Sequence, residues 1–586
     1  MIVRNEAHVV EELLNSVAPH ISSWVIVDTG SDDGTQEVIR NHMGRLGISG
    51  ELHERPWRDF GHNRTEALTL AQGHGDYIWI MDADDTIVGT PDFTNLSADI
   101  YSLRFSATNE VGSPIVIWRP LLVRDGLRVR YEGVVHENLV CDDPHVVARI
   151  EGDYHVNYRN LGARSRDPLV FARDRDLLLA EIERNPNDER AVIHLAQTYA
   201  SLGDFVNARK WFARRVEMGG PPEFLFYAMY QVAESMTKTG ASWPDVQDAL
   251  LRAWEFRPSR AEPLYAIAMR YRAEQRFQLG YQFAKLAAEI PFPEDETLFV
   301  NPEIYAWRAT EEQAICAGFI GKHAEAFTLF RQLLARPGVS DDARQRISAN
   351  RDVCAPVMLD LASSYPDAAV QQSLGADPGA AGEVVVSLIA GPDRAGTEAT
   401  LNSFLRCCTD LSRVGRILLI DVGLSSRDRE MLCERYGFIE FSHAGPVDRH
   451  GADLANVRAQ VDTRFWLHLG QGWRFFAPEN FITRLTAVLA AEAQVFQVGI
   501  NFADAVELTG DCAPEQAVRR SPDAGRYVLS DEMARGPAMF DTARLDQAGG
   551  VQVTDSDPIA ELGRRAQAAG LRTASLDEIL CIASVN

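Results

Sequence analysis

The stretch YIWIMDADD, residues 77–85, decides how the first part of this chain is expected to fold. Its first five residues form a short apolar run that predicts a buried strand, and Asp82, Asp84 and Asp85 follow where that strand would end. A second stretch, VDTGSDDGT at residues 27–35, places Asp28 at the end of another apolar run in the same way. Both acidic motifs are therefore predicted at the carboxyl edge of one sheet, where open α/β sheets bind ligands.

Strand and helix signals alternate around these motifs. The expected strands are 1–3, 24–27, 52–54 and 77–81, and the expected helices are 6–17, 35–43 and 62–72. This alternation predicts an α/β domain over residues 1–163 with a Rossmann-like, mostly parallel sheet. The opening MIVRNE is typical of the second half of a strand, so we expect either a true start a few residues upstream or a clipped first strand.

Residues 164–357 show helical patterns that repeat roughly every 34 residues, the period of a tetratricopeptide unit. Small and aromatic residues recur in register in three sets, which are Ala196, Tyr199, Gly203, Ala208 and Phe212; Ala268, Tyr271, Gly280 and Ala284; and Ala317, Gly321, Ala326 and Phe330. Small residues at these offsets let paired helices pack closely. We therefore favour a repeat solenoid over a generic helical domain.

Residues 358–382 are rich in Ala, Ser, Asp, Pro and Gly and are interpreted as a linker. Residues 383–586 return to α/β alternation, and a strand ending in Asp421 is followed by VGLS, much as Asp28 is followed by TGS. After the strand 465–469, however, GQG stands where the first domain has its acids. We expect a degenerate copy without metal-dependent catalysis, which binds the acceptor, stiffens the assembly or mediates homodimers. His468 is expected to be a buried strand histidine rather than a ligand.

Composition narrows the class of function. The net charge of −25 argues against a nucleic-acid partner, whose backbone is recognised by a basic surface. An acidic chain still holds a nucleoside diphosphate if a divalent cation bridges the like charges. Eight cysteines without a CxxC pair indicate a reduced, cytoplasmic protein. No apolar run approaches the ~18 residues of a membrane span, so no transmembrane segment is expected.

The acidic motifs suggest specific chemistry. Carboxylates two residues apart at a strand end suit Mg²⁺ or Mn²⁺, and such a cation neutralises charge that builds on a departing nucleoside diphosphate. Asp28 is suited to accept hydrogen bonds from a nucleobase or from ribose hydroxyls. The simpler alternatives are a solvated acidic turn at 82–85 and a helix N-cap at Ser31 or Asp33.

In this order, the motifs at 1–6, 24–35 and 82–85 resemble family 2 glycosyltransferases of the GT-A fold, over roughly residues 1–160. A GT-A domain followed by tetratricopeptide repeats is similar in layout to bacterial transferases that glycosylate peptides, including cysteine S-glycosyltransferases of bacteriocins. The resemblance implies an inverting transfer from a nucleotide sugar, with a UDP-sugar favoured, to a peptide, protein or glycan acceptor.

The resemblance also implies roles for individual residues. Asp28 would touch the nucleobase, Asp82 the ribose and Asp84 the metal, with Asn5 and Glu6 also at the nucleotide sugar. In FGHNR, residues 60–64, Arg64 would contact the nucleotide or hold Asp28, unless it is an ordinary surface arginine.

The segment YEGVVHE, residues 131–137, resembles the family's late motif. It implies His136 as a ligand of the metal or diphosphate and Glu137 as the general base, which an inverting transfer needs near the acceptor. A purely structural His–Glu pair is the rival interpretation. Asp85 and Glu132 remain alternative bases.

Two other classes of function stay open. A non-catalytic scaffold, in which the repeats bind a protein partner, is the main alternative; the intact acids at 82–85 argue against it. A nucleotidyltransferase ranks lower, because Arg4-Asn5-Glu6-Ala7 stands where that class usually carries a glycine-rich, basic loop.

Overall fold

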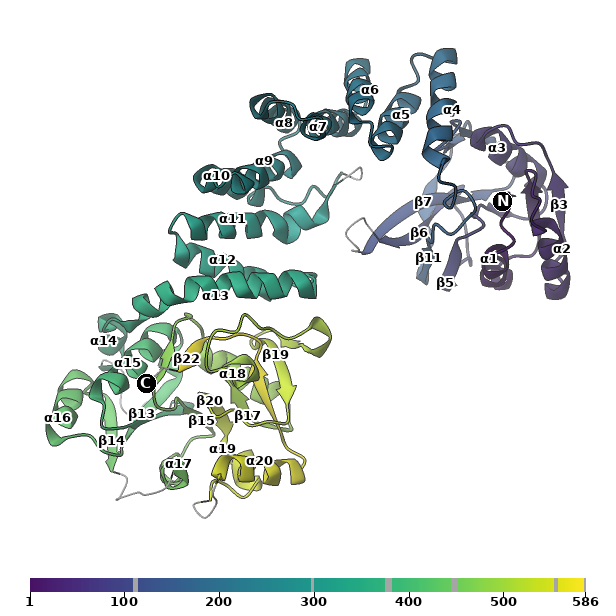
Figure 1. Ribbon diagram of the computed structural model, residues 1–586. Coiled ribbons are helices and arrows are strands. Elements are labelled where there is room, and N and C mark those ends of the chain that lie inside the picture. Colours follow the sequence, from purple (N-terminus) through teal and green to yellow (C-terminus); the bar gives the residue numbers. More distant parts are fainter. Residues whose placement is uncertain (109–113, 297–299, 375–381, 444–449, 553–556, 584–586) are drawn as a thin grey trace. The chain divides into compact units, whose positions relative to one another are not determined.

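The computed structural model describes residues 1–108, 114–296, 300–374, 382–443, 450–552 and 557–583 (Figure 1). It separates into two compact units, Met1–Pro258 with Asp295–Phe299, and Ser259–Glu294 with Val300–Asn586. Each unit contains one α/β domain and part of the helical repeats. Within the described residues, no helix has the length and apolar character needed to cross a membrane.

The N-terminal α/β domain follows the expected alternation of strands and helices. Its elements are β1 (Ile2–Val3), α1 (Val10–Val17), β2 (Trp24–Asp28), α2 (Thr35–Leu46), β3 (Gly50–Glu54), α3 (Phe60–Ala71), β4 (Tyr77–Trp79), β5 (Thr86–Pro91), β6 (Ile100–Thr108), β7 (Pro114–Arg124), β8 (Val129–Glu132), β9 (Asn138–Cys141), β10 (Val147–Arg149) and β11 (Gly152–Asn157). Helix α1 begins at Val10 and not at Glu6 as expected. The Glu6 carbonyl accepts the N–H groups of both Val9 and Val10, which closes a turn before the helix.

The strands of this domain form two main sheets. Strands β1, β2 and β3 pair in parallel, as expected, and β1 contributes only the pairs Ile2–Val27 and Val3–Asp28. The second sheet has the order β4-β7-β6-β11-β5, with β10 also on β6, and β4 and β6 both run antiparallel to β7. Strands β1 and β4 thus each form the edge of a sheet. Helices α1, α2 and α3 lie beside the first sheet (Figure 1).

Within each unit, consecutive helices of the repeat region pack against one another, over residues 170–256 in the first unit and 262–363 in the second, as the solenoid interpretation predicts. In the first unit these are α4 (Val170–Arg184), α5 (Glu189–Ser201), α6 (Phe205–Met218), α7 (Pro222–Lys238) and α8 (Trp243–Phe256). The second unit has α9 (Glu262–Ala273), α10 (Phe277–Ala288), a π-helical turn (Ile304–Arg308), α11 (Ala309–Phe319), α12 (His323–Ala335), α13 (Asp341–Ser363) and α14 (Asp367–Leu374). The alanines of the predicted sets are fully buried between helices: Ala196, Ala208, Ala268, Ala284, Ala317 and Ala326. Gly203 and Gly321 are instead exposed, in turns with left-handed backbone.

The linker predicted at 358–382 is wrong over residues 358–374. Helix α13 continues to Ser363 and α14 follows it. Met358, Leu359 and Ala362 recur at helical spacing and are buried, so apolar packing extends the helix through a segment whose composition resembles a linker. Residues 375–381 lie outside the described part of the chain.

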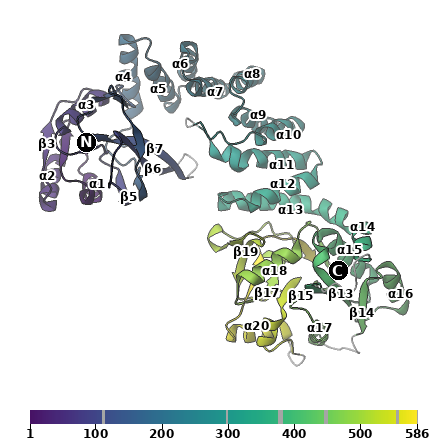
Figure 2. The same ribbon diagram turned by 180° about the vertical axis from the view of Figure 1, so that it is seen from behind.

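The second α/β domain is built on one sheet of nine strands in the order β14-β13-β12-β15-β20-β17-β21-β19-β18. Its elements are β12 (Val384–Ala390), α15 (Arg394–Cys407), β13 (Val414–Asp421), α16 (Ser426–Arg435), β14 (Ile439–His443), α17 (His450–Arg458), β15 (Phe465–His468), β16 (Trp473–Phe475), α18 (Phe481–Ala491), β17 (Val495–Gly499), β18 (Arg519–Ser521), β19 (Gly525–Ser530), β20 (Ala538–Asp541), α19 (Thr542–Gln547), α20 (Pro558–Ala568), β21 (Arg572–Leu576) and β22 (Cys581–Ala583). Within this unit, α13 packs against both α12 and α15 (Figure 2).

The close contact of α10 with α11 gives a test of the repeat packing. A Cβ added at Gly280 would lie 2.8 Å from the Cys316 sulfur, too close for a real contact. We expect Gly280→Ala to lower the free energy of unfolding by about 1–3 kcal/mol, because overpacking outweighs the better helix propensity of alanine. Urea denaturation of the full chain measures the change.

Gly318→Ala on α11 is the matched control, since its added Cβ would meet only the Ala326 Cβ at 3.9 Å. That variant should be neutral or stabilised by up to ~1 kcal/mol. Equal stability of the two variants would contradict the packing described for α10 and α11.

Candidate functional site

Asp28 lies at the end of β2, and one of its carboxylate oxygens is saturated. Its Oδ1 accepts backbone N–H bonds from Gly30 and Ser31, both at 2.9 Å, and a 3.1 Å bond from Gln36. Burial opposes the charge, but the bonds from Ser31 and Gly30 hold the pKa of Asp28 below its usual value. The other oxygen, Oδ2, is buried and has no hydrogen-bond partner among the described residues. An ionised carboxylate with one open oxygen is suited to accept a ligand N–H or O–H.

The turn after β1 lies against the Asp28 loop. Asn5 adopts a left-handed backbone with φ 57°, which asparagine tolerates better than most residues. Its N–H donates to the Ser31 hydroxyl and its side-chain oxygen accepts from Asp32 N–H, each at 2.9 Å. Glu6 N–H donates to the Thr35 hydroxyl at 2.8 Å. The predicted residues Asn5 and Glu6 are thus brought next to the Asp28 motif.

Arg64 on α3 joins the acidic motif after β4 to the late motif. Its guanidinium forms a 2.5 Å ion pair with Asp82 and a second, also 2.5 Å, with Glu137. Burial opposes the charge of Asp82, but Arg64 and then Arg119 hold its pKa below the usual value. The Tyr131 ring lies 5.7 Å from the guanidinium carbon of Arg64. Arg64 was also predicted to hold Asp28, but the described contacts include no bond between the two. Arg64 instead pairs with Asp82 and Glu137.

Asp84 and Glu6 face a backbone segment, Leu161–Ala163, that carries no acidic or basic side chain. Asp84 Oδ2 accepts the N–H groups of Leu161 and Gly162, both at 2.8 Å, and Glu6 accepts Ala163 N–H at 3.2 Å. A Cβ on Gly162 would lie 3.2–3.3 Å from the carboxylate oxygens of both acids. Burial, with Asp84 nearby, raises the pKa of Glu6 to about 7. We name Leu161–Ala163 the amide strap.

Asp85 is the most buried member of the acidic motif, at 1% exposure. Its Oδ1 has no hydrogen-bond partner among the described residues. Burial, followed by the charges of Asp82 and Asp84, raises its pKa to about 8. Crowded carboxylate oxygens of this kind fit a hard divalent cation. In the described residues, however, no three His, Cys, Asp or Glu side chains are gathered to hold a metal, because Asp82 faces Arg64 and Asp84 faces the amide strap.

His136, the second predicted metal ligand, contacts the first repeat. Its ring stacks on His194 of α5, with centroids 4.6 Å apart and planes at 26°. Its carbonyl accepts a hydrogen bond from Arg190 of the same helix, and its backbone is left-handed with φ 52°. Burial, followed by the charge of His136, lowers the pKa of His194 to about 3. Asp84 and His136 therefore have separate partners.

Several residues at the site were not singled out in the sequence. Arg119 lies 4.0 Å from Asp82, and the amide strap acts through backbone N–H groups, which leave no side-chain signal. His194 sits on a repeat helix far along the chain. Glu132, one alternative base, is exposed and ion-paired with Arg130.

The second domain repeats the Asp28 turn but completes it differently. Asp421 Oδ1 accepts N–H bonds from Gly423 and Leu424, while Arg429 donates to Oδ2, with a 2.8 Å bond from its Nε. Arg429 and Gln36 each stand eight residues after their aspartate. A Cβ on Gly391 would meet the Gln471 amide at 2.1 Å, so this glutamine packs against the end of β12. The second domain therefore has the same aspartate turn as the first, but both carboxylate oxygens of Asp421 have hydrogen-bond partners within the chain.

His468 is a buried strand histidine, as expected, at 9% exposure. Its Nδ1 lies 2.9 Å from the Ser387 hydroxyl, which also accepts from the Trp466 indole. Burial lowers the pKa of His468 to about 4.

Comparison with known proteins finds similarity to one family model and to a repeat-containing protein. Residues 1–90 match the family model described as glycosyl transferase family 2. The matched residues include both acidic motifs, at Asp28 and at Asp82 to Asp85. A TPR repeat-containing protein of Synechococcus elongatus is 25% identical over 284 residues, which are 46% of this chain and 66% of that relative. The chain thus spans just under two thirds of the relative's length. The helical repeats and the second α/β domain lie outside residues 1–90.

Two solved structures show weak overall similarity. The crystal structure of MamA is 18% identical, with a TM-score of 0.24, covering 30% of this chain and 94% of MamA. The mannosyltransferase PcManGT from Pyrobaculum calidifontis, in complex with GDP-Man and Mn²⁺, is 11% identical, with a TM-score of 0.27, covering 41% of this chain and 69% of that structure.

The opposite environments of Asp82 and Asp85 predict opposite dependences of stability on pH. The folded pKa of Asp85 is above its unfolded value, so the native state holds the proton longer and wild-type stability falls as pH rises from about 4 to 8. Asp85→Asn removes this loss and should become progressively more stable than wild type over that interval. Urea denaturation between pH 5 and 9 measures the difference.

Asp82→Asn is the matched variant. The folded pKa of Asp82 is lowered, so its contribution is present above its unfolded pKa and is lost only as pH falls through the folded value. This variant should be destabilised throughout pH 5–9. The same slope against pH for both variants would contradict the assigned environments.

Proposed function

We propose that this chain is a metal-dependent, inverting glycosyltransferase that moves a sugar from a nucleotide-sugar donor, with a UDP-sugar favoured, to a peptide, protein or glycan acceptor. The observation that carries the proposal is the pair of ion pairs made by Arg64. It ties Asp82, in the donor motif, to Glu137, the candidate base, so one buried cation holds both halves of the reaction site.

On the donor side, the open Oδ2 of Asp28 accepts a hydrogen bond from the nucleobase or ribose. Asn5 and Glu6 lie beside this position through their bonds to the Asp28 loop. Asp84 would hold Mg²⁺ or Mn²⁺, with Asp82 and Asp85 close by in the chain, and His136 is the further residue that would contact the cation or the diphosphate. When bound, the cation supplies positive charge that stabilises the leaving nucleoside diphosphate. The amide strap occupies one Asp84 oxygen, Oδ2, so a cation held by Asp84 would compete for that oxygen with the N–H groups of Leu161 and Gly162.

On the acceptor side, Glu137 takes the proton from the acceptor hydroxyl or thiol. Its side chain is 12% exposed, whereas Asp85 as a residue is only 1% exposed, so an acceptor reaches Glu137 more easily. Arg64 fixes the orientation of the Glu137 carboxylate. The neighbouring His136 contacts α5, which supports acceptor delivery along the repeats.

A non-catalytic scaffold is the second candidate. It is favoured by the two hydrogen bonds that Asp84 Oδ2 accepts from the amide strap, and by the finding that no three potential metal ligands are gathered in the described residues. In that case the repeats recruit a protein partner and no nucleotide binds.

Donor binding is tested with UDP and Mn²⁺. Asp28→Asn should weaken the binding of UDP measured by calorimetry by about tenfold or more, because a hydrogen bond to a charged group contributes roughly 1.5–3 kcal/mol. Asp421→Asn, the same change in the second domain, should leave the affinity at wild-type level, since Arg429 already occupies that carboxylate. No binding by wild type across UDP and GDP, each with Mn²⁺, would favour the scaffold.

The general base is tested by the hydrolysis of UDP-sugars in a donor panel. Glu137→Gln should lower kcat roughly 10²–10⁴-fold while UDP affinity stays within about threefold, because the residue acts on the proton and not on the nucleotide. Glu132→Gln, at an exposed carboxylate five residues earlier, is the comparison. A larger loss in Glu132→Gln than in Glu137→Gln would move the base to Glu132.

A further inference from the structure

Arg119 stands on the inward-facing side of β7. In the ladder between β6 and β7 it lies opposite Leu103, which is fully buried, and residues opposite one another share a face of the sheet. Its guanidinium carbon lies 5.0 Å from the centre of the Phe105 ring, which is also buried, yet the Arg119 side chain is 40% exposed. The stem thus packs on the apolar core, while the charged end reaches solvent.

The register of β4 and β7 brings Arg119 to the acidic motif. The last pair of this ladder joins Trp79 to Leu122. Three residues further along this antiparallel register come Asp82 and Arg119, and Arg119 Nη1 lies 4.0 Å from Asp82 Oδ2. The ladder between β6 and β7 is irregular at Leu121, which has no partner on β6. Irregularities of this kind re-aim nearby side chains and are frequent beside active sites.

The hydrogen-bond donors of Arg119 are unused among the described residues. Asp82 forms its close ion pair with Arg64, at 2.5 Å, and 4.0 Å is too long for a hydrogen bond from Arg119. Another arginine beside the acids, Arg159, donates to Glu12 and to a backbone carbonyl. The side chains of Arg64 and Arg159 are 13% and 15% exposed, so of these three arginines Arg119 is the one that a ligand reaches most easily.

Arg119 and the Asp28 loop lie at opposite ends of a row of contacts. Glu6, which is bonded to that loop, faces the amide strap, and so does Asp84. Asp82 stands two residues before Asp84, and Arg119 is the next contact beyond it. A nucleotide whose base or ribose meets Asp28 would therefore have its phosphates directed toward Arg119.

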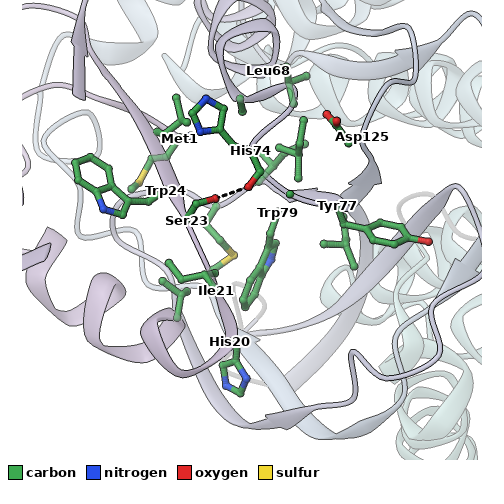
Figure 3. A pocket seen from close by; sticks show the side chains of 18 of the residues that line it. Met1, His20, Ile21, Ser23, Trp24, Leu68, His74, Tyr77, Trp79 and Asp125 are labelled. Carbon is green, nitrogen blue, oxygen red and sulfur yellow. Dashed lines mark hydrogen bonds between the residues drawn. The ribbon is translucent and has the colours of Figure 1, made fainter. Parts of the chain in front are cut away.

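The cavity beside β4 does not offer an equivalent site for an anion. It has a volume of about 900 Å³, and Tyr77 and Trp79 of β4 stand in its wall (Figure 3). Its lining is mostly apolar and does not include Arg119. Its arginines, Arg64 and Arg124, already form ion pairs with acids. An anion is costly to bury without a free partner, so the phosphates are expected outside this cavity, at Arg119.

We propose that Arg119 binds the terminal phosphate of the donor's nucleoside diphosphate through the guanidinium N–H groups that the described residues leave unused. The inference rests on the proposed function and adds a binding residue on its donor side. A planar guanidinium donates two parallel hydrogen bonds to phosphate oxygens, which suits it to this group. The stacking on Phe105 limits the movement of the side chain and so lowers the entropy that binding costs.

Arg119 acts on the atom that gains charge during the transfer. The acceptor oxygen or sulfur forms a bond with the anomeric carbon of the sugar and loses its proton to Glu137. The bond from that carbon to the terminal phosphate breaks, and its electron pair stays on the phosphate oxygen. A guanidinium at this phosphate stabilises the added negative charge.

The test uses calorimetry of the full chain with Mn²⁺, and compares uridine monophosphate (UMP) with UDP and, in parallel, GMP with GDP. Arg119→Met keeps an apolar stem over Phe105 and removes the guanidinium. In the series that wild type binds, this variant should weaken binding of the diphosphate roughly tenfold or more and of the monophosphate less than about threefold. Asp28→Asn should weaken both to a similar extent, because Asp28 meets the base or ribose that both share.

Arg149→Met is the matched control. The Arg149 guanidinium carbon lies 4.7 Å from the centre of the Trp118 ring, on β10 of the same sheet, and no acid is among its described contacts. The variant removes a similarly stacked cation and should leave both affinities within about twofold of wild type. Arg119→Lys, which keeps the charge without the planar pair of donors, should recover only part of the affinity for the diphosphate.

Two results would overturn the inference while the proposed function stands. One is equal affinity of wild type and Arg119→Met for the diphosphate. The other is a loss of the same size for the monophosphate and the diphosphate, since Arg119 would then not distinguish the terminal phosphate. Wild type that binds neither UDP nor GDP would remove the proposed function, and this inference with it.

Discussion

The two ion pairs of Arg64 are the interaction on which the rest of the candidate site depends. The guanidinium is 13% exposed and bridges Asp82, which follows β4, and Glu137, which precedes β9. Removing a partner from a buried ion pair leaves an uncompensated charge, which is strongly destabilising. The three elements α3, β4 and the loop before β9 are therefore held in one arrangement by charge. The position of the candidate base follows from the packing of α3.

The second constraint is that Asp82, Asp84 and Asp85 lie close together with few basic side chains beside them. Each carboxylate is compensated differently, Asp82 by Arg64, Asp84 by the amide strap and Asp85 by retention of its proton. Backbone N–H groups and a divalent cation compete for the same carboxylate oxygen, because both bind its lone pairs. Under the proposed function, binding of a cation at Asp84 and the hydrogen bonds of the amide strap would therefore be coupled. A net charge of −25 makes this local compensation more important, since the chain as a whole supplies little positive field.

The strand ends could be predicted from sequence because apolar runs followed by acids have a simple physical meaning. Asp28 and Asp82 were located in this way, and the repeats followed from small residues in register. The amide strap could not be predicted, since its contribution is backbone N–H groups placed by a long-range turn. Stacking of His136 on His194 depends on how α5 packs, which no local pattern encodes. Helix α13 runs into the expected linker because three buried apolar residues outweigh a composition typical of loops.

The two α/β domains show why an incomplete hydrogen-bond set is informative. Both aspartates at the end of the second strand saturate one oxygen with two backbone N–H groups. Arg429 then satisfies the other oxygen of Asp421, whereas Gln36 donates to the oxygen of Asp28 that is already bonded. A buried acceptor without a partner costs roughly 1–3 kcal/mol, and natural folds rarely leave one. In the second domain, Arg429 removes this cost by donating to Asp421. The same turn can therefore give both carboxylate oxygens a hydrogen-bond partner. The first domain instead keeps Asp28 Oδ2 open, and the proposed function assigns to this oxygen a hydrogen-bond donor of the nucleotide.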